Sequence, residues 1–300
     1  MTARSLATAC TTACLCLFAS QAALAQAAGD TLQKIKETGS ITLGYRESSV
    51  PFSFLDGQQK PVGISMDLCN AIVDKVKQQL NLPKLEVKQI AVNSSNRIPL
   101  VVNGTVDVEC GGTANNAARQ KQVSFSVATF VSQPMWLARA DAKVSKPTDL
   151  KGKTIVVTQG SNAVAFARKF NDEQKMELTV IQAKDHGESM LTLDSGRASA
   201  WLEDDILLAG EKANSRNGAS FVLVPSGLDI IYYGLMLKKD DAPFKALVDG
   251  VIAGLMKSGE FDKLYKKWYE SPIPPRNVNL AFAMSDKLKE RIKTPSDKID

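Results

Sequence analysis

Histidine is almost absent from this sequence, with His186 as the single one in 300 residues. One histidine and the two cysteines that follow the first 25 residues do not form a set of zinc ligands at the usual spacing, so we expect neither a metal nor another cofactor. No second histidine could activate a nucleophile, and no G-x-S-x-G turn occurs. We therefore expect a protein that is not an enzyme.

A phosphate-binding loop is missing as well. Segment 152–154, Gly-Lys-Thr, matches the end of such a loop, but Pro147 stands where a glycine is needed and the segment precedes its strand. Net charge is also small, because 37 Lys and Arg face 32 Asp and Glu. The basic residues are scattered, as in Lys263, Lys266 and Lys267, so nucleic acid is not an expected partner.

Long apolar runs are confined to the first 25 residues. Arg4 precedes an apolar stretch that starts at Leu6, and small residues follow up to Ala25, which is the layout of a secretory signal peptide with an Ala-x-Ala cleavage site. The stretch is too short for a membrane anchor and is interrupted by threonine. We expect residues 1–25 to be removed and the protein to be exported to the periplasm.

Cysteine is scarce in the exported chain. Three of the five cysteines lie within the signal peptide, which leaves Cys69 and Cys110. Because the exported compartment is oxidising, we expect a Cys69–Cys110 disulfide. Two buried, unbonded cysteines are the alternative, since Cys69 lies one position off the apolar stripe of a helix predicted to run to Leu80 with Ser65 as its N-cap.

The sequence does contain an alternation of short apolar runs and helical stripes, which is typical of an α/β protein. The order helix, glycine cap and strand occurs at 98–110 and again at 190–202, with Gly104 and Gly196 as the caps. This internal echo predicts two similar lobes. We expect each lobe to be a mixed sheet flanked by helices. The predicted strands are 41–45, 85–90, 106–110, 153–158, 178–181 and 198–202.

Two extended apolar runs, 135–139 and 230–237, lie far apart in the chain. Such a pair fits a chain that enters a second lobe and later returns, with a hinge of two strands and a ligand cleft between the lobes. The predicted boundaries are 30–136 and 236–300 for lobe one, 139–230 for lobe two, and 137–138 and 231–235 for the hinge crossings.

Residues that follow the predicted strands should face this cleft, because ligands of open α/β sheets sit outside the carboxyl ends of strands. Three arginines and one acidic cluster would then converge. An amino acid with an acidic side chain carries two carboxylates and one ammonium, which arginine forks and an opposing carboxylate would hold. The strand-end residues are Arg46, 94–97, 111–119, 158–162 and 203–205.

Several segments resemble the periplasmic glutamate/aspartate-binding proteins of ABC transporters, over essentially the whole exported chain. The resemblance implies a type II periplasmic-binding-protein fold, L-glutamate or L-aspartate as ligand, an inner-membrane ABC permease as partner, and a monomer. The segments are 44–53 (GYRESSVPFS), 96–100 (NRIPL), 109–111 (ECG), 115–120 (NNAARQ), 183–187 (AKDHG) and 273–275 (IPP).

The resemblance also implies roles for single residues. Arg119 corresponds to the arginine that clamps the ligand α-carboxylate, and Asp204 to the aspartate that takes the ammonium. Arg46, His186, and Ser94 with Arg97 correspond to groups that recognise the acidic side chain. Two further residues, at 161 and 162, resemble a turn that caps the carboxylate at a helix N-terminus. The full candidate ligand-binding set is Arg46, Ser94, Arg97, Thr113, Arg119, Thr158, Ser161, Asn162, His186 and Asp204.

Two positions, Gly112 and Ala114, depart from the hydroxyl residues usual in this family, and only Thr113 between them keeps a hydroxyl. We expect a weaker grip on the ligand head group, and space beside Gly112 for a bulkier acidic ligand. Two other functions stay open at this point, a dehydratase-like periplasmic enzyme on the same fold and a ligand sensor for a membrane receptor. The enzyme would need an unpaired cleft carboxylate, whereas Asp204 has an expected ammonium partner.

Overall fold

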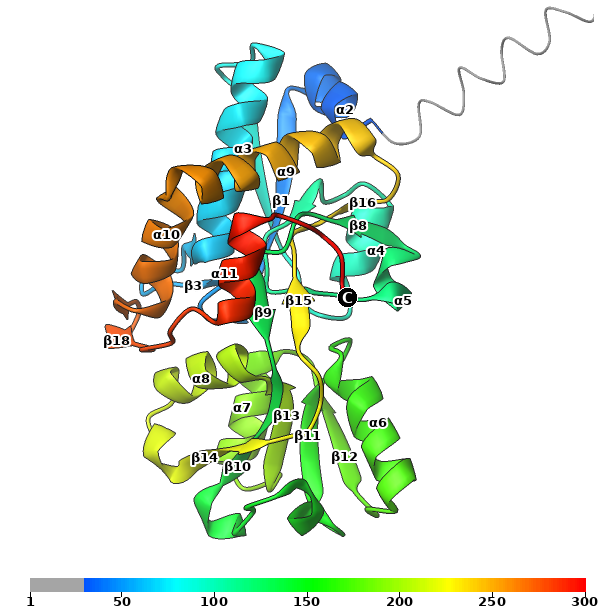
Figure 1. Ribbon diagram of the computed structural model, residues 1–300, viewed down its shortest axis with the longest axis vertical. Coiled ribbons are helices and arrows are strands. Elements are labelled where there is room, and N and C mark those ends of the chain that lie inside the picture. Colours follow the sequence, from blue (N-terminus) through cyan, green and yellow to red (C-terminus); the bar gives the residue numbers. More distant parts are fainter. Residues whose placement is uncertain (1–29) are drawn as a thin grey trace, which may run out of the picture.

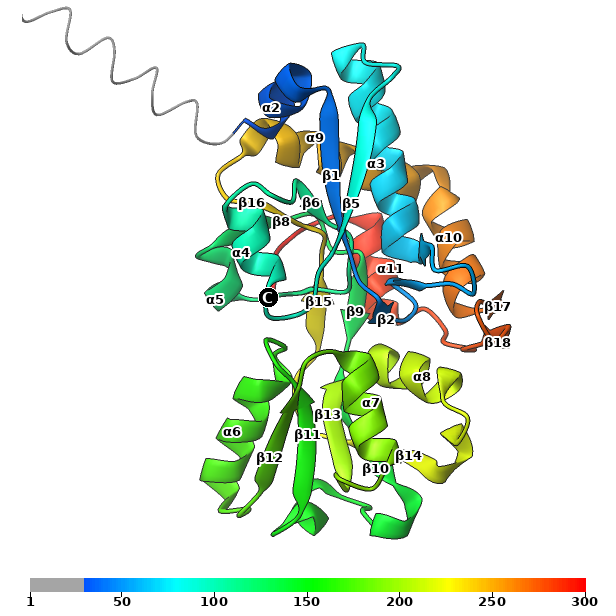
Figure 2. The same ribbon diagram turned by 180° about the vertical axis from the view of Figure 1, so that it is seen from behind.

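The computed structural model describes residues 30–300, and the expected signal peptide at 1–25 lies outside that range. The described chain forms two lobes, one above the other in Figure 1, and passes between them twice. Each lobe is built on a five-stranded sheet with helices packed against it, as the opposite view in Figure 2 also shows. This is the two-lobed α/β architecture that the sequence predicts.

Lobe one carries the sheet β5-β1-β6-β16-β8, in which β5, β1 and β6 are parallel and β16 is antiparallel to β6 and β8. The sheet is therefore mixed, as expected. Its strands are β1 (Ser40–Tyr45), β5 (Glu86–Ala91), β6 (Val108–Glu109), β8 (Val123–Phe125) and β16 (Met236–Lys238). Its helices are α2 (Thr31–Thr38), α3 (Ile64–Leu80), α4 (Arg97–Val102), α5 (Ala117–Gln120), α9 (Ala242–Ser258), α10 (Glu260–Tyr269) and α11 (Asp286–Lys293).

Lobe two carries the sheet β12-β11-β13-β10-β14, again mixed, with β10 antiparallel to both of its neighbours. Its strands are β10 (Pro134–Arg139), β11 (Thr154–Thr158), β12 (Thr179–Ala183), β13 (Ala200–Asp204) and β14 (Phe221–Pro225). Its helices are α6 (Ala163–Gln174), α7 (His186–Asp194) and α8 (Asp205–Asn214), and its 3₁₀ turns are η1 (Ala140–Ala142), η2 (Pro147–Leu150) and η3 (Gly218–Ser220).

The lobes are joined by a small antiparallel sheet of β7 (Ala114–Asn115), β15 (Ile231–Tyr233) and β9 (Phe130–Ser132). The first crossing therefore lies at 130–133, earlier than the expected 137–138. Residues 137–138 are inside β10, where Leu137 pairs with Trp201 in the sheet of lobe two. Their apolar side chains are buried in the core of that lobe. The prediction misplaced the crossing because buried hinge strands are equally apolar in sequence.

The two glycine caps of the internal echo adopt the predicted conformation. Gly104 follows α4 with φ of 76°, and Gly196 follows α7 with φ of 78°. Both values lie in the left-handed region, which glycine enters without steric cost.

Helix α3 begins one residue before its expected N-cap. Gly63 precedes it with φ of 133°, and a Cβ there would lie 2.2 Å from the carbonyl oxygen of Phe52, so this close approach requires glycine. Ser65 is inside the helix, and its hydroxyl donates to the carbonyl oxygen of Gly111 at 3.1 Å. The predicted cap was wrong because the helix start is determined by the close contact of Gly63 with the Phe52 carbonyl, and no side chain caps it.

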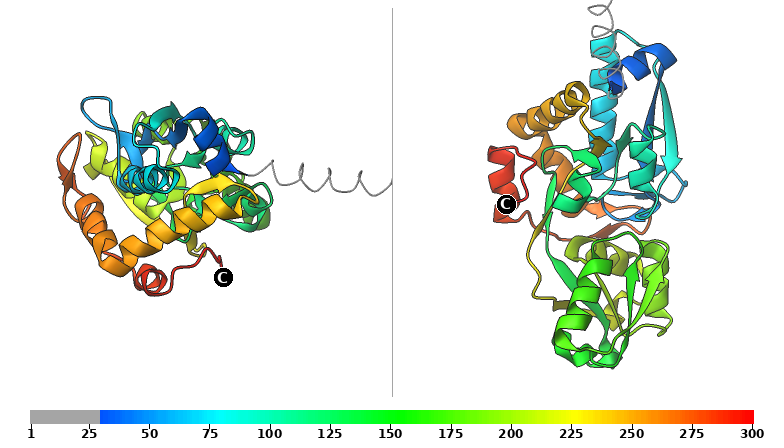
Figure 3. Two further views of the ribbon diagram at one scale, coloured as in Figure 1. Left: turned by 90° about the horizontal axis from the view of Figure 1, so that it is seen from above. Right: turned by 90° about the vertical axis from the view of Figure 1, so that its right-hand side faces the viewer.

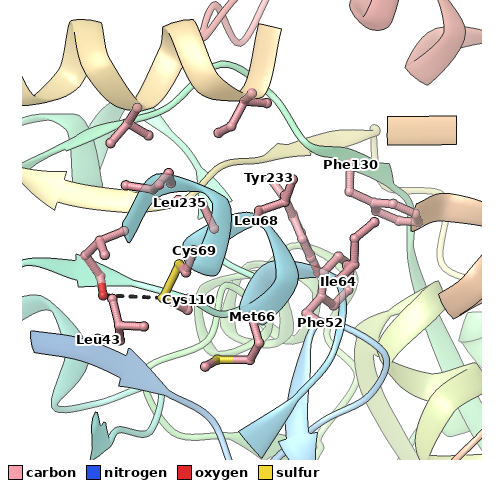
Figure 4. Close-up of a cluster of buried hydrophobic side chains, with 14 of the residues drawn as sticks. Leu43, Phe52, Ile64, Met66, Leu68, Cys69, Cys110, Phe130, Tyr233 and Leu235 are labelled. Carbon is pink, nitrogen blue, oxygen red and sulfur yellow. Dashed lines mark hydrogen bonds between the residues drawn. A yellow bond between two sulfur atoms is a disulfide. The ribbon is translucent and has the colours of Figure 1, made fainter. Parts of the chain in front are cut away.

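A disulfide joins Cys69 of α3 to Cys110, which follows β6, and the two Cα atoms lie 6.2 Å apart. This confirms the predicted pairing. Both cysteines are fully buried, and Figure 4 shows the bond among Leu43, Leu68 and Leu235. The bond thereby fixes α3 to the sheet of lobe one.

The C-terminal segment packs against the hinge sheet, as Figure 3 shows for α11. Asn115 of β7 donates to the carbonyl oxygen of Asp297 at 2.8 Å, and the guanidinium of Arg291 lies 4.2 Å from the ring centre of Tyr232 in β15. The C-terminal segment therefore contacts each of the three hinge strands.

Two short sheets complete the fold, β2 (Ser48–Ser49), β3 (Ser53–Leu55) and β4 (Pro61–Val62), and β17 (Pro272–Ile273) with β18 (Val278–Asn279). Between residues 30 and 300, every helix is too short or too polar to cross a membrane. The same range holds no group of three or more His, Cys, Asp or Glu placed to bind a metal.

Candidate functional site

A small cavity lies between the lobes, where the carboxyl ends of their parallel strands meet. Its volume is about 10 Å³, roughly the space of one water molecule, so an amino acid can enter only if the lobes or the lining side chains move. Residues from both lobes line it: Ser94, Arg97, Gly112, Ala114, Arg119, Ser161, Asn162, His186, Glu203, Asp204 and Leu207.

Arg46 follows β1 and is 1 % exposed. Its Nη2 donates to Ser94 Oγ at 3.1 Å, and Ser94 in turn lines the cavity. Within the described chain, its Nη1 has no hydrogen-bond partner. A buried guanidinium with an unused donor is suited to a carboxylate placed beside it.

Arg97 is the first residue of α4, and it is held from behind by two neighbours. Its Nη1 donates to Thr113 Oγ1 at 2.5 Å and lies 3.7 Å from Glu109 Oε1. Thr113 donates in turn to Glu109 Oε2 at 2.6 Å. Thr113 and Glu109 therefore orient Arg97, and the Thr113 hydroxyl is already used inside lobe one.

Arg119 lies in α5, whose first turn is capped by the side chain of Asn116. Its Nη1 donates to the carbonyl oxygen of Ala114 at 2.8 Å, and its Nη2 donates across the cleft to the carbonyl oxygen of Gly160 at 3.1 Å. The guanidinium thus spans the two lobes at the edge of the cavity.

Lobe two presents the turn before α6 to the cavity. Asn162 accepts a hydrogen bond from Asn116 Nδ2 at 3.0 Å, and Ser161 Oγ accepts one from the backbone N–H of Ala163 at 3.2 Å. Thr158 is not brought to the cavity with them. Its hydroxyl lies 2.9 Å from Ser189 Oγ inside lobe two, so the structure places it behind the wall.

His186 opens α7 and is buried against β2. Its Nδ1 lies 3.1 Å from both the Ser49 hydroxyl and the Ser48 carbonyl oxygen. A carbonyl oxygen only accepts hydrogen bonds, so Nδ1 carries the proton of the neutral ring and Nε2 carries a lone pair. Nε2 faces Glu203 Oε2 at 3.8 Å. Burial, and then the charges of Arg46 and Arg97, hold the pKa of His186 well below its usual range.

Asp204 ends β13 and meets the hinge. The Tyr233 hydroxyl of β15 donates to Asp204 Oδ2. Burial, reinforced by the adjacent Glu203, raises the pKa of Asp204 well above its ordinary value. An ammonium group placed beside this carboxyl would favour its ionised form.

The arginines remain cationic near neutral pH although they are deeply buried. Burial and the neighbouring Arg97 lower the pKa of Arg46 to about 10 and that of Arg119 to about 9. On the acidic side, burial raises the pKa of Glu203, and it raises the pKa of Glu211 in α8 to about 8.

Two glycines of lobe two mark places where the lobes meet without room for a side chain. A Cβ on Gly160 would lie 2.5 Å from the carbonyl oxygen of Ser94. A Cβ on Gly210 in α8 would lie 2.5 Å from the carbonyl oxygen of Val50. Together with the cross-cleft hydrogen bonds, this close contact means that the described structure is the closed form.

The space expected beside Gly112 is filled. A Cβ on Gly112 would lie 2.7 Å from Phe52 Cδ2 and 3.1 Å from Tyr233 Cε2. The missing side chain therefore accommodates two aromatic rings, Phe52 of lobe one and Tyr233 of the hinge, instead of a larger ligand. That part of the expectation was wrong, because the direction of the Cβ bond at 112 cannot be read from the sequence.

Four residues of the site had no role in the sequence-based set. Glu203 was among the strand-end residues but received no assignment, and a rule that kept every strand-end charge would have included it. Glu109 orients Arg97, while Leu207 lines the cavity from α8. Tyr233 reaches Asp204 only through the hinge pairing, for which the sequence holds no local signal.

The chain belongs to the bacterial extracellular solute-binding proteins, family 3. The model of that family matches residues 41–271. Solved structures agree with the fold. A mutant of ArgBP from T. maritima aligns with a TM-score of 0.69 at 26 % identity, covering 79 % of this chain and 98 % of that one. An ancestral arginine-binding protein bound to glutamine aligns with a TM-score of 0.68 at 26 % identity, covering 77 % and 98 %. The fold is thus the type II periplasmic-binding-protein fold.

More specific relatives are found among curated proteins. The glutamate/aspartate import solute-binding proteins of Salmonella typhimurium and Escherichia coli are each 49 % identical over 274 residues, 91 % of either chain. The L-glutamate/L-aspartate-binding protein of Pseudomonas aeruginosa is 48 % identical over 269 residues, 89 % of either chain. These relatives are solute-binding proteins and not enzymes.

Proposed function

We propose that this protein captures an acidic amino acid, L-glutamate or L-aspartate, and delivers it to an inner-membrane ABC permease. The observation that carries the proposal is the convergence at one small cavity of Arg97 and Arg119 from lobe one, with Arg46 behind Ser94, and the Glu203–Asp204 pair from lobe two. Two carboxylates and one ammonium complement such a set of charges. The names of relatives 48 to 49 % identical support the same ligand class.

In this proposal Arg119 binds the α-carboxylate and Asp204 binds the ammonium. Arg46 and Arg97 face the side-chain carboxylate, and His186 lies beside it at the cavity wall. Thr158 supports the turn before α6 from behind. Hydroxyl and amide groups at the cavity wall complete the contacts: Ser94, Ser161 and Asn162. Thr113 contributes from behind by orienting Arg97.

We further propose that residues 1–25 are cleaved as a signal peptide and that the protein works as a monomer in the periplasm, without nucleic acid. Its two lobes would rotate about the strands β9 and β15 to admit and enclose the ligand.

Titration calorimetry against the amino acids and simple dicarboxylates tests the ligand class. We expect L-glutamate and L-aspartate to bind with dissociation constants of micromolar or below, about a hundredfold more tightly than glutamine or asparagine. The bound ligand should elute chemically unchanged. The absence of binding by both acidic amino acids would refute the proposal.

Side-chain recognition has its own test in Arg46→Ala. A second cation is needed only for a second carboxylate, so glutamate binding should weaken at least about tenfold more than glutamine binding. The exposed Arg168→Ala is the matched control and should change neither. Equal losses for the two ligands would contradict the role of Arg46.

A further inference from the structure

Glu203 is the charged residue of the site that the roles above leave unexplained. It is 2 % exposed and lines the cavity, and among residues 30–300 its Oε2 has no hydrogen-bond partner. Its Oε1 accepts a long hydrogen bond, 3.3 Å, from the backbone N–H of Asp204. The Ser161 hydroxyl lies near the carboxyl and works against the effect of burial on its pKa. The ionisable groups facing it come from both lobes and the hinge: His186, Asp204, Arg46, Arg97, Arg119 and Tyr233. The next acids are Asp205, which acts on Asp204, and Glu109, which acts on the arginines.

With an acidic amino acid bound, the site has no positive charge left to balance an ionised Glu203. The three arginines balance Glu109 and the two carboxylates of an acidic amino acid, and Asp204 balances its ammonium. An ionised Glu203 would then be one negative charge too many at a buried position. Such an unpaired buried charge is strongly unfavourable, and the usual outcome is that a group takes up a proton.

The contact with His186 points to the same conclusion. The Ser48 carbonyl oxygen fixes the proton of the neutral imidazole on Nδ1, so the lone pair of Nε2 faces Glu203 Oε2 at 3.8 Å. Two acceptors then face one another, and one proton placed between them turns a repulsive contact into a favourable one. The Glu203–His186 pair is therefore the place where an added proton is best accommodated.

We propose that Glu203 determines specificity by coupling ligand charge to protons: the Glu203–His186 pair takes up one proton from solvent when an acidic amino acid is enclosed. This inference rests on the proposed function. The proton adds to the carboxylate oxygen or to Nε2, and no covalent bond of the ligand changes. A neutral amino acid such as glutamine brings one carboxylate fewer, so Glu203 balances the third arginine and no proton is needed. Burial already raises the pKa of Glu203, in the direction that this uptake requires.

The test is to count protons by titration calorimetry in buffers of different ionisation enthalpy, with L-glutamate and L-glutamine as ligands. Wild-type protein at pH 7 should take up about one more proton with glutamate than with glutamine. Its dissociation constant for glutamate should rise relative to that for glutamine by up to about tenfold per pH unit above neutrality. Glu203→Gln should abolish both differences and bind glutamate more tightly than wild type at pH 8.

Glu211→Gln is the matched control. Glu211 is also buried, and in the described part of the chain its Oε1 lacks a partner, but it does not line the cavity. Closure buries it alike around either ligand, so this variant should keep the glutamate–glutamine difference of about one proton. If Glu203→Gln does not fold, Glu203→Met takes its place. The pH dependence of wild-type affinity is a further test that needs no variant.

An equal proton count for glutamate and glutamine in wild type, or an unchanged difference in Glu203→Gln, would overturn the inference. Failure of the proposed function gives a different result. In that case neither glutamate nor aspartate produces binding heat with any variant between pH 5.5 and 8.5.

Discussion

The two lobes contribute opposite charges to the cavity between them. Within the described chain, the arginines at the cavity all belong to lobe one, whereas lobe two supplies Glu203, Asp204 and the neutral His186. The acid of lobe one, Glu109, is already engaged with Arg97 and Thr113. The difference teaches that carboxylate recognition is concentrated in one lobe, so lobe one can hold an acidic ligand before lobe two closes over its ammonium.

The lobes also differ in how they are stabilised. Lobe one has the disulfide and a stack in which Tyr269 lies 4.2 Å from the ring centre of Tyr265 and 5.2 Å from that of Phe130. Lobe two has two smaller cores, one on each face of its sheet, and it buries the unpaired carboxyl of Glu211. Lobe one therefore has both the larger core and the covalent cross-link.

Replacing both Cys69 and Cys110 by alanine should have the largest effect and should weaken lobe one selectively. A cross-link over a sequence separation of 41 residues contributes about 3 to 4 kcal/mol in the chain-entropy account. Hydrogen exchange should show lower protection for the amides of β1, while those of β11 in lobe two stay close to wild type. Equal losses in both strands would show that the lobes unfold as one unit.

Arg119→Ala should reduce affinity by roughly a hundredfold for glutamate and for glutamine alike. The change removes a charge-assisted contact to the α-carboxylate, worth about 2 to 3 kcal/mol, and every amino acid carries that group. Calorimetry measures the affinities, and circular dichroism checks that the fold is retained. A loss of tenfold or less would contradict the assignment of this arginine.

Asp204→Asn tests the opposite lobe. It should reduce the affinity for amino acids about ten- to a hundredfold, because the ammonium loses a charged partner. Dicarboxylates that lack an amino group should bind the variant no worse than wild type, since they present no ammonium. Parallel titrations with L-glutamate and glutarate separate the two cases. A similar loss for both ligands would mean that Asp204 acts through the structure of the hinge.

Glu211→Gln should leave ligand affinity close to wild type and should appear as a change in the pH dependence of stability. The pKa of Glu211 is raised from 4.5 to about 8, so the folded protein holds a proton that the unfolded chain releases. Its contribution to stability is complete below pH 4.5 and is lost as the pH rises towards 8, by about 1 kcal/mol between pH 6 and 7. Urea unfolding at several pH values should show that loss in wild type but not in the variant. Parallel pH profiles would contradict it.

Much of the architecture could be predicted from the sequence because it depends on local patterns. Apolar runs gave the strands, the glycines at 104 and 196 ended helices, and the rule that ligands bind at strand ends brought Arg97, Arg119 and Asp204 to one cavity. The first hinge crossing could not be placed this way. Buried strands of a sheet and of a hinge carry the same apolar residues, and only pairing partners distinguish them.

The errors within the site have a related origin. Thr158 ends its strand as predicted, but its side chain points to Ser189, because strand position does not specify which face a terminal residue presents. The surroundings of Gly112 depend on Phe52 and Tyr233, which are distant in the sequence. Tertiary contacts between remote segments decide these details, and one sequence contains no record of them.

Gly160 and Gly210 have a mechanical consequence. At each of them the two lobes touch directly. Gly210 lies inside the regular helix α8, so an alanine there would add one carbon atom 2.5 Å from the Val50 carbonyl oxygen without straining its own backbone. That single methyl group would keep the two lobes from closing fully, while the ligand-binding side chains within each lobe stayed in place. A partner that distinguishes the closed form from the open form would therefore respond to a change between the lobes smaller than one methyl group.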